Sequence, residues 1–221
     1  MEHIVKINSI RQVTHDVRSY RFTKPEGYTF IPGQATEVSL NEPGWTEQKR
    51  PFTFTSLNEW PELEFTIKQY DDHDGVTHHV GKLQIGDEII IRDVWGAIAY
   101  KGEGYFIAGG AGITPFIAIF RQLHRDKKTG GNHLYFSNKT VSDIILHDEL
   151  DAMLGKNVHY VITGEENPRY GKGYIDREFL KREIKDFKKP FYICGPDKMV
   201  SGISEALIQL GASPEAVVFE K

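Results

Sequence analysis

The stretch Tyr105–Phe120, YFIAGGAGITPFIAIF, decides the fold of this chain. Its opening residues are apolar or aromatic and indicate a buried strand, after which Phe116, Ile119 and Phe120 recur with the period of a helix. The glycines between them let a ligand approach the backbone, and the start of the helix offers unpaired N–H groups to a phosphate. The stretch therefore predicts a strand, a phosphate-binding loop and a helix. Its spacing differs from G-x-G-x-x-G, so a tight turn that binds nothing is the alternative.

Composition restricts the class of protein. The chain has 221 residues, a net charge of −4 and one cysteine, Cys194. Mixed charges do not suggest binding to nucleic acid or to a membrane surface. A lone cysteine excludes a disulfide framework, an iron–sulfur centre and a zinc ribbon. No signal peptide and no bilayer-spanning apolar run is evident, so we expect a cytoplasmic protein.

Residues 1–100 have the pattern of short antiparallel strands. The expected strands cover residues 3–7, 17–22, 36–40, 52–55, 63–68 and 88–91. One helix is expected from about Gly75 to Leu83. Six strands joined by short turns predict a small antiparallel β-barrel.

Residues 101–221 change to alternating strands and helices after the glycine-rich segment 101–104. Apolar runs at 105–108, 133–136, 158–162, 191–194 and 216–219 are expected to be strands. Such alternation predicts an α/β domain with a five-stranded parallel sheet covered by helices on both faces.

The segment Arg50-Pro51-Phe52-Thr53-Phe54-Thr55-Ser56 places an arginine, a ring and hydroxyls on one strand. Alternation lets Arg50 and Phe52 share a face. A guanidinium and an aromatic ring suit a ligand that has a phosphate and a flat ring, and Thr53 is placed to hydrogen-bond a ring nitrogen. An ordinary strand with a surface arginine is the alternative.

Five motifs, in order along the chain, resemble those of the ferredoxin–NADP reductase superfamily, and the bacterial ferredoxin or flavodoxin reductases in particular. They are Phe30-Ile31-Pro32-Gly33-Gln34, Arg50-Pro51-Phe52-Thr53, Gly75-Val76-Thr77, Gly109-Gly110-Ala111-Gly112-Ile113-Thr114-Pro115, and Cys194-Gly195-Pro196 with Met199. The resemblance implies that the barrel binds FAD and that the second domain binds NAD(P)H.

The resemblance also implies roles for individual residues. Arg50 is expected to hold a flavin phosphate, Phe52 to stack on the isoalloxazine, and Thr53 to hydrogen-bond near N5. Thr53 and Cys194 are expected at the point of hydride transfer, although a plain buried cysteine is the alternative for the latter. The residues expected to bind the flavin or the dinucleotide are Arg50, Pro51, Phe52, Thr53, Lys68, Gly75, Val76, Thr77, Gly110, Gly112, Ile113, Thr114, Lys139, Cys194, Gly195 and Pro196.

The activity implied is that of a flavoprotein reductase, which takes a hydride from NAD(P)H and passes electrons singly to a separate acceptor. We expect a monomer whose acceptor is a flavodoxin, a ferredoxin or an oxygenase subunit. Two alternatives stay open: a reductase of free flavin, and an electron-transfer subunit or binding module that needs a larger complex. FAD is expected as the cofactor, and FMN is the less expected alternative. FMN stays open because Arg50 and the Gly75 loop are able to hold either phosphate group.

Departures from the family pattern lead to further expectations. Phe52 replaces the commoner tyrosine, so the redox properties of the flavin are expected to differ. Phe219 falls inside the last expected strand and is expected in the core. The nicotinamide face of the flavin is then expected to be open. Glu220 is expected to be an exposed terminal acid. Ser137-Asn138-Lys139-Thr140 contains a cation and no acid, which favours NADPH over NADH, with Arg169 and Tyr170 as a possible second contact.

No metal site is expected. Asp71, Asp72, His73 and Asp74 precede His78 and His79. Adjacent histidines on a helix face different ways and no third ligand has suitable spacing, so a solvated loop near the flavin is favoured.

Overall fold

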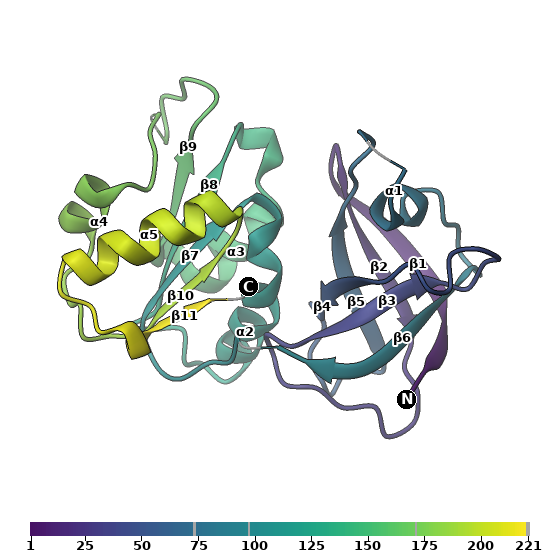
Figure 1. The fold of residues 1–221 in the computed structure, drawn as a ribbon. Coiled ribbons are helices and arrows are strands. Elements are labelled where there is room, and N and C mark those ends of the chain that lie inside the picture. The colour runs from purple at the N-terminus through teal and green to yellow at the C-terminus, as the bar shows by residue number, and fades with distance from the viewer. Residues whose placement is uncertain (73, 97, 171, 220–221) are drawn as a thin grey trace.

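The first half of the chain forms an antiparallel sheet in the order β4-β3-β6-β1-β2-β5 (Figure 1). The computed structural model describes residues 1–72, 74–96, 98–170 and 172–219. The elements of this N-terminal lobe are β1 (His3–Thr14), β2 (Val17–Thr23), β3 (Ala35–Leu40), β4 (Arg50–Thr53), β5 (Glu62–Lys68), α1 (Val76–Val80) and β6 (Glu88–Trp95). A bridge between Phe54 and Phe65 joins the two edges, so the sheet closes into a barrel.

Aromatic rings fill the barrel. Tyr20, Phe22, Phe54 and Phe65 are fully buried, and the Phe54 and Phe65 ring centroids lie 4.9 Å apart. These side chains come from alternate positions of their strands, so the inward face is apolar as a half-exposed antiparallel sheet requires.

Three elements of this lobe differ clearly in length from their expected ranges. β6, expected at residues 88–91, runs on to Trp95. β1 has 12 residues because His3–Lys6 pair with β6 and Ile7–Thr14 pair with β2, so one strand serves two neighbours. α1 has only five residues, since the chain leaves the helix at Gly81 for a turn that includes Leu83.

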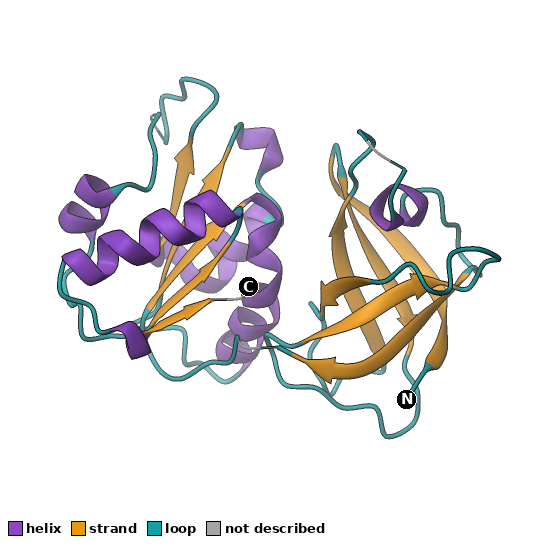
Figure 2. Cartoon of the chain, viewed as in Figure 1, coloured by secondary structure: helices purple, strands orange, loops and turns teal. Residues whose placement is uncertain are grey.

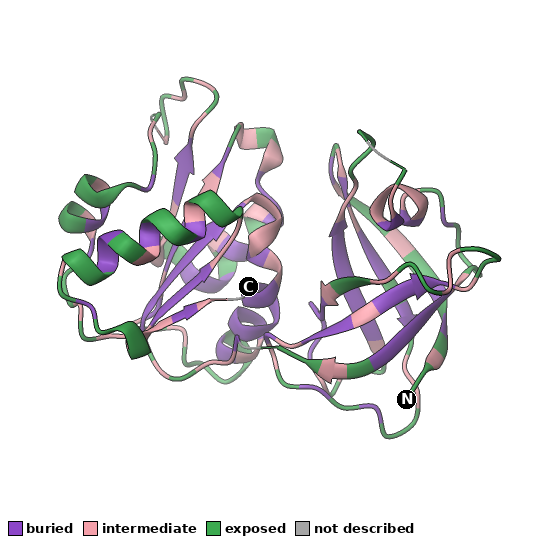
Figure 3. Ribbon diagram, in the orientation of Figure 1, coloured by how far each residue is buried: buried purple, intermediate pink, exposed green. Residues whose placement is uncertain are grey.

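The second half forms a parallel sheet in the order β11-β10-β7-β8-β9, and helices flank these strands (Figure 2). The elements of this C-terminal lobe are β7 (Tyr105–Gly109), η1 (Gly110–Ile113), α2 (Thr114–Arg125), β8 (His133–Asn138), η2 (Val141–Asp143), α3 (His147–Leu154), η3 (Gly155–Asn157), β9 (Val158–Ile162), α4 (Arg177–Glu183), β10 (Phe191–Cys194), α5 (Asp197–Gln209), η4 (Pro214–Ala216) and β11 (Val217–Phe219). Helices α2 and α3 cover one face and α4 and α5 the other. The strands between them are buried along most of their length (Figure 3). The predicted fold class, an antiparallel barrel followed by an α/β parallel sheet, is confirmed.

The two lobes share apolar contacts. Val17 and Ile98 belong to the same buried cluster as α2 and α3. Gly33 has a φ of +100° and leaves room there, since a Cβ at this position would stand 3.3 Å from Ile119 Cδ1 and closer still to the Ile98 carbonyl oxygen. The Pro-Gly turn before β3 therefore lies at the contact between the lobes. None of the helices within the described residues has the length and apolar character needed to cross a bilayer.

Candidate active site

Strand β4 presents the residues expected to hold the flavin. It pairs residue by residue with β3, so Arg50 and Phe52 lie on one face. The exposed Arg50 donates from Nη1 to the Lys49 carbonyl at 2.8 Å. It pairs with no carboxylate among the described residues. Its guanidinium is therefore available to an external phosphate.

Phe52 and Thr53 differ in burial. Phe52 is half-buried and packs against the barrel core, with its ring centroid 6.3 Å from that of Phe65. Thr53 is 9% exposed and lies opposite Ala35. No described residue hydrogen-bonds the Thr53 hydroxyl, which leaves that group for a ligand.

Helix α1 follows the loop that is expected to bind a flavin phosphate. Its first helical hydrogen bond runs from His79 N to Gly75 O at 3.1 Å. The amide groups of Gly75, Val76 and Thr77 thus have no acceptor within the helix. Gly75 has no side chain to cap them.

Carboxylates around α1 pair with two separate histidines. His78 Nδ1 lies 2.8 Å from Asp71 Oδ1, and His79 Nε2 lies 2.6 Å from Asp74 Oδ1. The His79 hydrogen bond, opposed by a smaller effect of burial, holds the pKa of Asp74 below its usual value. The indole of Trp45 covers His79 at 3.8 Å between ring centroids. The two histidines therefore serve different partners, while His73 lies outside the described residues.

The loop at Gly110–Ile113 forms one 3₁₀ turn before α2 begins at Thr114. Thr114 Oγ1 donates to Ala111 O at 3.0 Å, which holds the turn. A Cβ at Gly112 would stand 2.6 Å from Gly195 N and nearer still to the Cys194 carbonyl. Gly112 is thus required by close contact between two backbones, in addition to any approach of a ligand.

Cys194, Gly195 and Pro196 lie at the carboxyl end of β10, against that loop. Cys194 is half-buried and pairs in register with Ala108 of β7. Pro196 precedes the first residue of α5. The structure therefore brings together the two sequence motifs that are expected to hold the dinucleotide.

Lys68 ends β5, the strand that the Phe54–Phe65 bridge brings beside β4. Its Nζ lies 2.7 Å from Asp16 Oδ2. Burial alone raises the pKa of Asp16, but hydrogen bonds from Lys68 and Thr14 leave it below its usual value. Lys68 is therefore paired with a carboxylate and must leave it to bind a cofactor phosphate.

Lys139 follows β8 at the carboxyl edge of the parallel sheet. Its carbonyl accepts from Gly164 N at 2.8 Å, and the amide of nearby Val141 donates to Glu165 Oε1 at 2.8 Å. Glu165 was not foreseen, because residues 137–140 contain no acid and the contact joins distant segments. A cation and a carboxylate thus share this edge.

Three further polar residues lie near the same edge. Asn138 is 4% exposed, and neither its Nδ2 nor its Oδ1 has a partner among the described residues. Arg169 lies 3.6 Å from Asp151 of α3 and stacks on the Tyr170 ring at 5.0 Å. Arg169 is thus engaged with α3.

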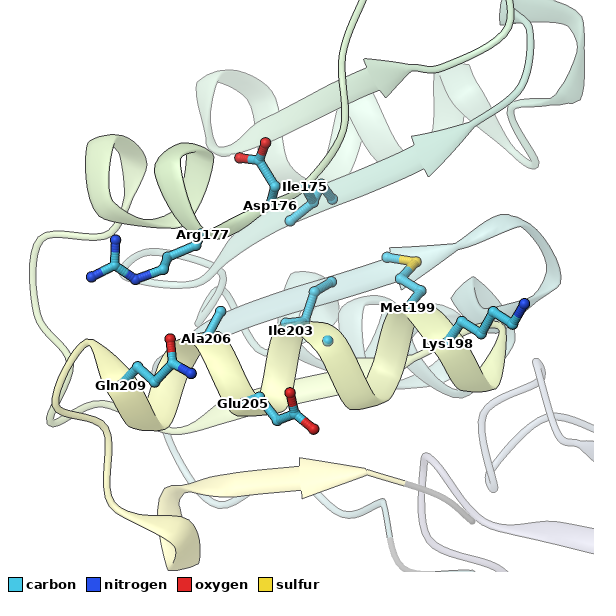
Figure 4. A pocket seen from close by; sticks show the side chains of 10 residues that line it. Ile175, Asp176, Arg177, Lys198, Met199, Ile203, Glu205, Ala206 and Gln209 are labelled. Atoms are coloured by element: carbon cyan, nitrogen blue, oxygen red, sulfur yellow. The ribbon is translucent and has the colours of Figure 1, made fainter.

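A groove of about 340 Å³ runs along α5 (Figure 4). Met199, which follows the Cys-Gly-Pro turn, lies at one end of it and Gln209 at the other. Its lining residues are Ile175, Asp176, Arg177, Lys198, Met199, Gly202, Ile203, Glu205, Ala206 and Gln209. It contains no residue of β4 or of the Gly110–Thr114 loop.

Phe219 ends β11 and packs against the core cluster of α4 and α5, as expected. Glu220 lies outside the described residues. Sequence analysis did not identify Arg121 of α2, which is buried. Its place among the apolar residues of this helix is the only sign of burial that the sequence offers.

Comparison with known proteins agrees with this geometry. Residues 4–100 match the oxidoreductase FAD-binding domain family, and residues 106–205 match the oxidoreductase NAD-binding domain family. The chain is 30% identical over 223 residues to NADH-cytochrome b5 reductase 1 of Pyricularia oryzae, covering 90% of this chain and 71% of that protein. It is 28% identical to the reductase component of propane 2-monooxygenase from Rhodococcus jostii, covering 98% of this chain and 62% of that protein.

The fold also matches a solved structure. A ferredoxin NADP+ reductase from Neisseria gonorrhoeae, with bound FAD and NADP, superposes with a TM-score of 0.87 at 22% identity over 99% of this chain and 98% of that one. The chain belongs to the ferredoxin reductase-like flavoprotein superfamily. By class it is an NAD(P)H-dependent flavoprotein reductase, with an FAD-binding and an NAD-binding domain.

Proposed function

We propose that this chain is an FAD-dependent reductase that oxidises NAD(P)H and delivers electrons singly to a separate redox protein such as a flavodoxin or ferredoxin. Residues 1–100 are proposed to hold FAD and residues 101–221 the nucleotide. The contact of Gly112 with the Cys194–Gly195 peptide carries the proposal, because the two segments that we propose to bind the nucleotide lie against each other at one edge of the sheet. When bound, the flavin supplies the chemistry of hydride acceptance and single-electron release, and the protein supplies position and electrostatics.

The N-terminal lobe has the groups that such a cofactor needs. We propose that Arg50 binds a flavin phosphate and that the amides of Gly75–Thr77 bind the pyrophosphate. Among the described residues Arg50 pairs with no carboxylate and donates only to the Lys49 carbonyl, and those amides have no acceptor within the helix. Phe52 offers a half-buried ring for stacking. The Thr53 hydroxyl is proposed to hydrogen-bond N5 and so to orient the ring for transfer.

The donor is proposed to be NADPH, with NADH accepted more weakly. Lys139 supports this choice as the cation after β8. The nearby carboxylate of Glu165 opposes it, so we expect the preference to be small. Removing the negative charge of Glu165 is the direct test of the proposed preference for NADPH.

The acceptor is proposed to be a protein, with this chain acting as a monomer. The names of the similar proteins support this choice: one is the reductase component of a monooxygenase and another is an NADH-cytochrome b5 reductase. A reductase of free flavin is the second candidate, supported by the exposure of Arg50 and Pro51 on β4.

The first experiment is to purify the protein, record its visible spectrum, and mix it anaerobically with NADPH and separately with NADH. A yellow protein that is bleached faster by NADPH supports the proposal. Bleaching with ready loss of the flavin on gel filtration favours the free-flavin reductase. A protein that binds neither FAD nor FMN refutes the assignment of Arg50, Phe52 and Thr53.

A further inference from the structure

Helix α2 carries two polar groups on one face. It begins at Thr114, beside the nucleotide loop, and Arg121 follows seven residues later, which is about two turns and returns to the same side. The Arg121 side chain is only 8% exposed. A buried guanidinium needs partners for its charge and its donors.

Two of those partners belong to the other lobe. Arg121 Nη1 donates to Thr55 O at 2.7 Å and to Glu64 Oε1 at 2.6 Å. Thr55 lies two residues after Thr53 on the segment that leaves β4, and its hydroxyl hydrogen-bonds Glu64 Oε1 at 2.9 Å. One guanidinium therefore connects the nucleotide helix to the flavin strand.

The remaining donors bind the C-terminal lobe. Nε and Nη2 of Arg121 donate to the two oxygens of Glu149 on α3, at 2.5 and 3.0 Å. The Trp60 ring lies 5.1 Å from the guanidinium carbon. These contacts fix the orientation of the guanidinium plane, which lysine has no means to reproduce.

The carboxylate in this network is deeply buried. Glu64 is 2% exposed, and its second oxygen accepts from Arg21 Nε at 3.2 Å. Burial is the largest single effect and raises the pKa of Glu64, but the charge of Arg121 and the hydrogen bonds from Arg121, Thr55 and Arg21 together lower it below its usual value, so the carboxyl is ionised at neutral pH. A buried ion pair of this kind is often no more stabilising than apolar side chains of equal volume. The effect to be expected of this ion pair is therefore the geometry that it imposes on the two lobes.

We propose that Arg121 is a positioning residue that fixes the C-terminal lobe against the strand of Thr53 and so sets the separation between nicotinamide and flavin. This inference rests on the proposed function. Hydride transfer requires the reacting atoms within about 3–3.5 Å of each other, and a displacement of about 1 Å costs on the order of 100-fold in rate. Loosening this connection therefore slows transfer without removing any group that binds either ligand.

The test compares Arg121→Gln, Arg121→Lys and the double variant Arg121→Gln/Glu64→Gln with the wild type. Arg125→Gln is the matched control, because Arg125 lies one turn further along α2 and pairs with Glu59 of the other lobe, but with its side chain 45% exposed. The flavin-reduction rate at saturating NAD(P)H is measured by anaerobic stopped flow, with separate titrations of flavin and nucleotide. Hydrogen exchange of residues 13–17 and 141–145, on either side of the lobe contact, is measured in the flavin-free protein.

We expect Arg121→Gln to lower the reduction rate about 10- to 100-fold, with both dissociation constants within about threefold of the wild type. Exchange at the lobe contact should accelerate in the same variant. Arg121→Lys should recover part of the rate, and Arg125→Gln should match the wild type.

The double variant keeps the test decisive if Arg121→Gln does not fold, because it leaves no unpaired buried carboxylate. A double variant that folds and reduces flavin more slowly than the wild type supports the inference. Variants that fold and reduce flavin at the wild-type rate overturn it, as does a loss confined to the dissociation constants. If the wild type itself is reduced by neither nucleotide, the proposed function fails, and unchanged exchange in the Arg121 variants then overturns the positioning role separately.

Discussion

Substituting Gly112 with alanine should separate the nucleotide loop from the Cys194–Gly195 turn. The φ of Gly112 lies outside the left-handed region, so alanine is not strained by its own backbone. Its Cβ would stand 2.6 Å from Gly195 N, whereas ordinary contact begins at 3.4 Å. Because the obstructing atoms are backbone, one segment must retreat by roughly 1 Å.

Overpacking of this kind costs about 1–3 kcal/mol. For a chain of this length, that corresponds to a fall of about 2–12 °C in Tm. The same retreat should lower the flavin-reduction rate by about 100-fold. Calorimetry and anaerobic stopped flow measure the two effects independently.

Gly202→Ala is the matched control, because no atom of the described residues lies within 4 Å of a Cβ there. Gly202 is inside helix α5, so alanine should raise stability by about 0.5–1 kcal/mol. A Gly112→Ala protein with the wild-type Tm and the wild-type reduction rate would refute the argument, since the loop and the turn would then have to lie further apart.

Three other substitutions test the site. Arg50→Gln should weaken FAD binding about 10- to 100-fold through loss of a charged hydrogen bond to phosphate, measured by fluorescence titration of the flavin-free protein. Glu165→Gln should lower the KM for NADPH relative to that for NADH about threefold or more by removing a repelling charge, measured by steady-state kinetics. Glu64→Gln should flatten the acid side of the stability profile, measured as urea midpoints from pH 7 to pH 3. Because the pKa of Glu64 is lowered in the folded protein, its contribution is present above the ordinary carboxyl pKa of about 4.3 and is lost as pH falls through the folded value.

Each of these has a contrary result. Arg11→Gln, a substitution at another exposed arginine, is the control for Arg50→Gln. If the two variants bind FAD with equal affinity, the flavin phosphate does not lie at β4. Equal effects of Glu165→Gln on both nucleotides would place that carboxylate away from the 2′ position. Parallel urea profiles for the wild type and Glu64→Gln would mean that the pKa of Glu64 is the same in the folded and unfolded states.

The sequence was sufficient for elements whose signal is local. Alternation located the barrel strands, and the Tyr105–Phe120 stretch located the loop where β7 passes into α2. The length of β1 was not predictable in this way, because its ends are determined by two different neighbours.

The candidate site was predictable only where each residue acts through its own segment. The buried roles of Arg121 and Glu64 depend on contacts across 57 residues of sequence, and a charged residue in a periodic pattern ordinarily indicates solvent. The contact of Glu165 with Val141 likewise joins residues that are far apart in sequence. The close contact of Gly112 with Cys194 was also hidden, because glycine in a phosphate loop already has a sufficient local explanation.

The apolar cluster that contains Val17 and Ile98 together with α2 and α3 affects how the chain can come apart. Side chains from both halves complete one core, so separating the halves exposes apolar surface on each. Heating should therefore melt the chain in a single cooperative transition. A gene fragment that encodes residues 101–221 alone should yield a protein that aggregates, because that surface is then left in water.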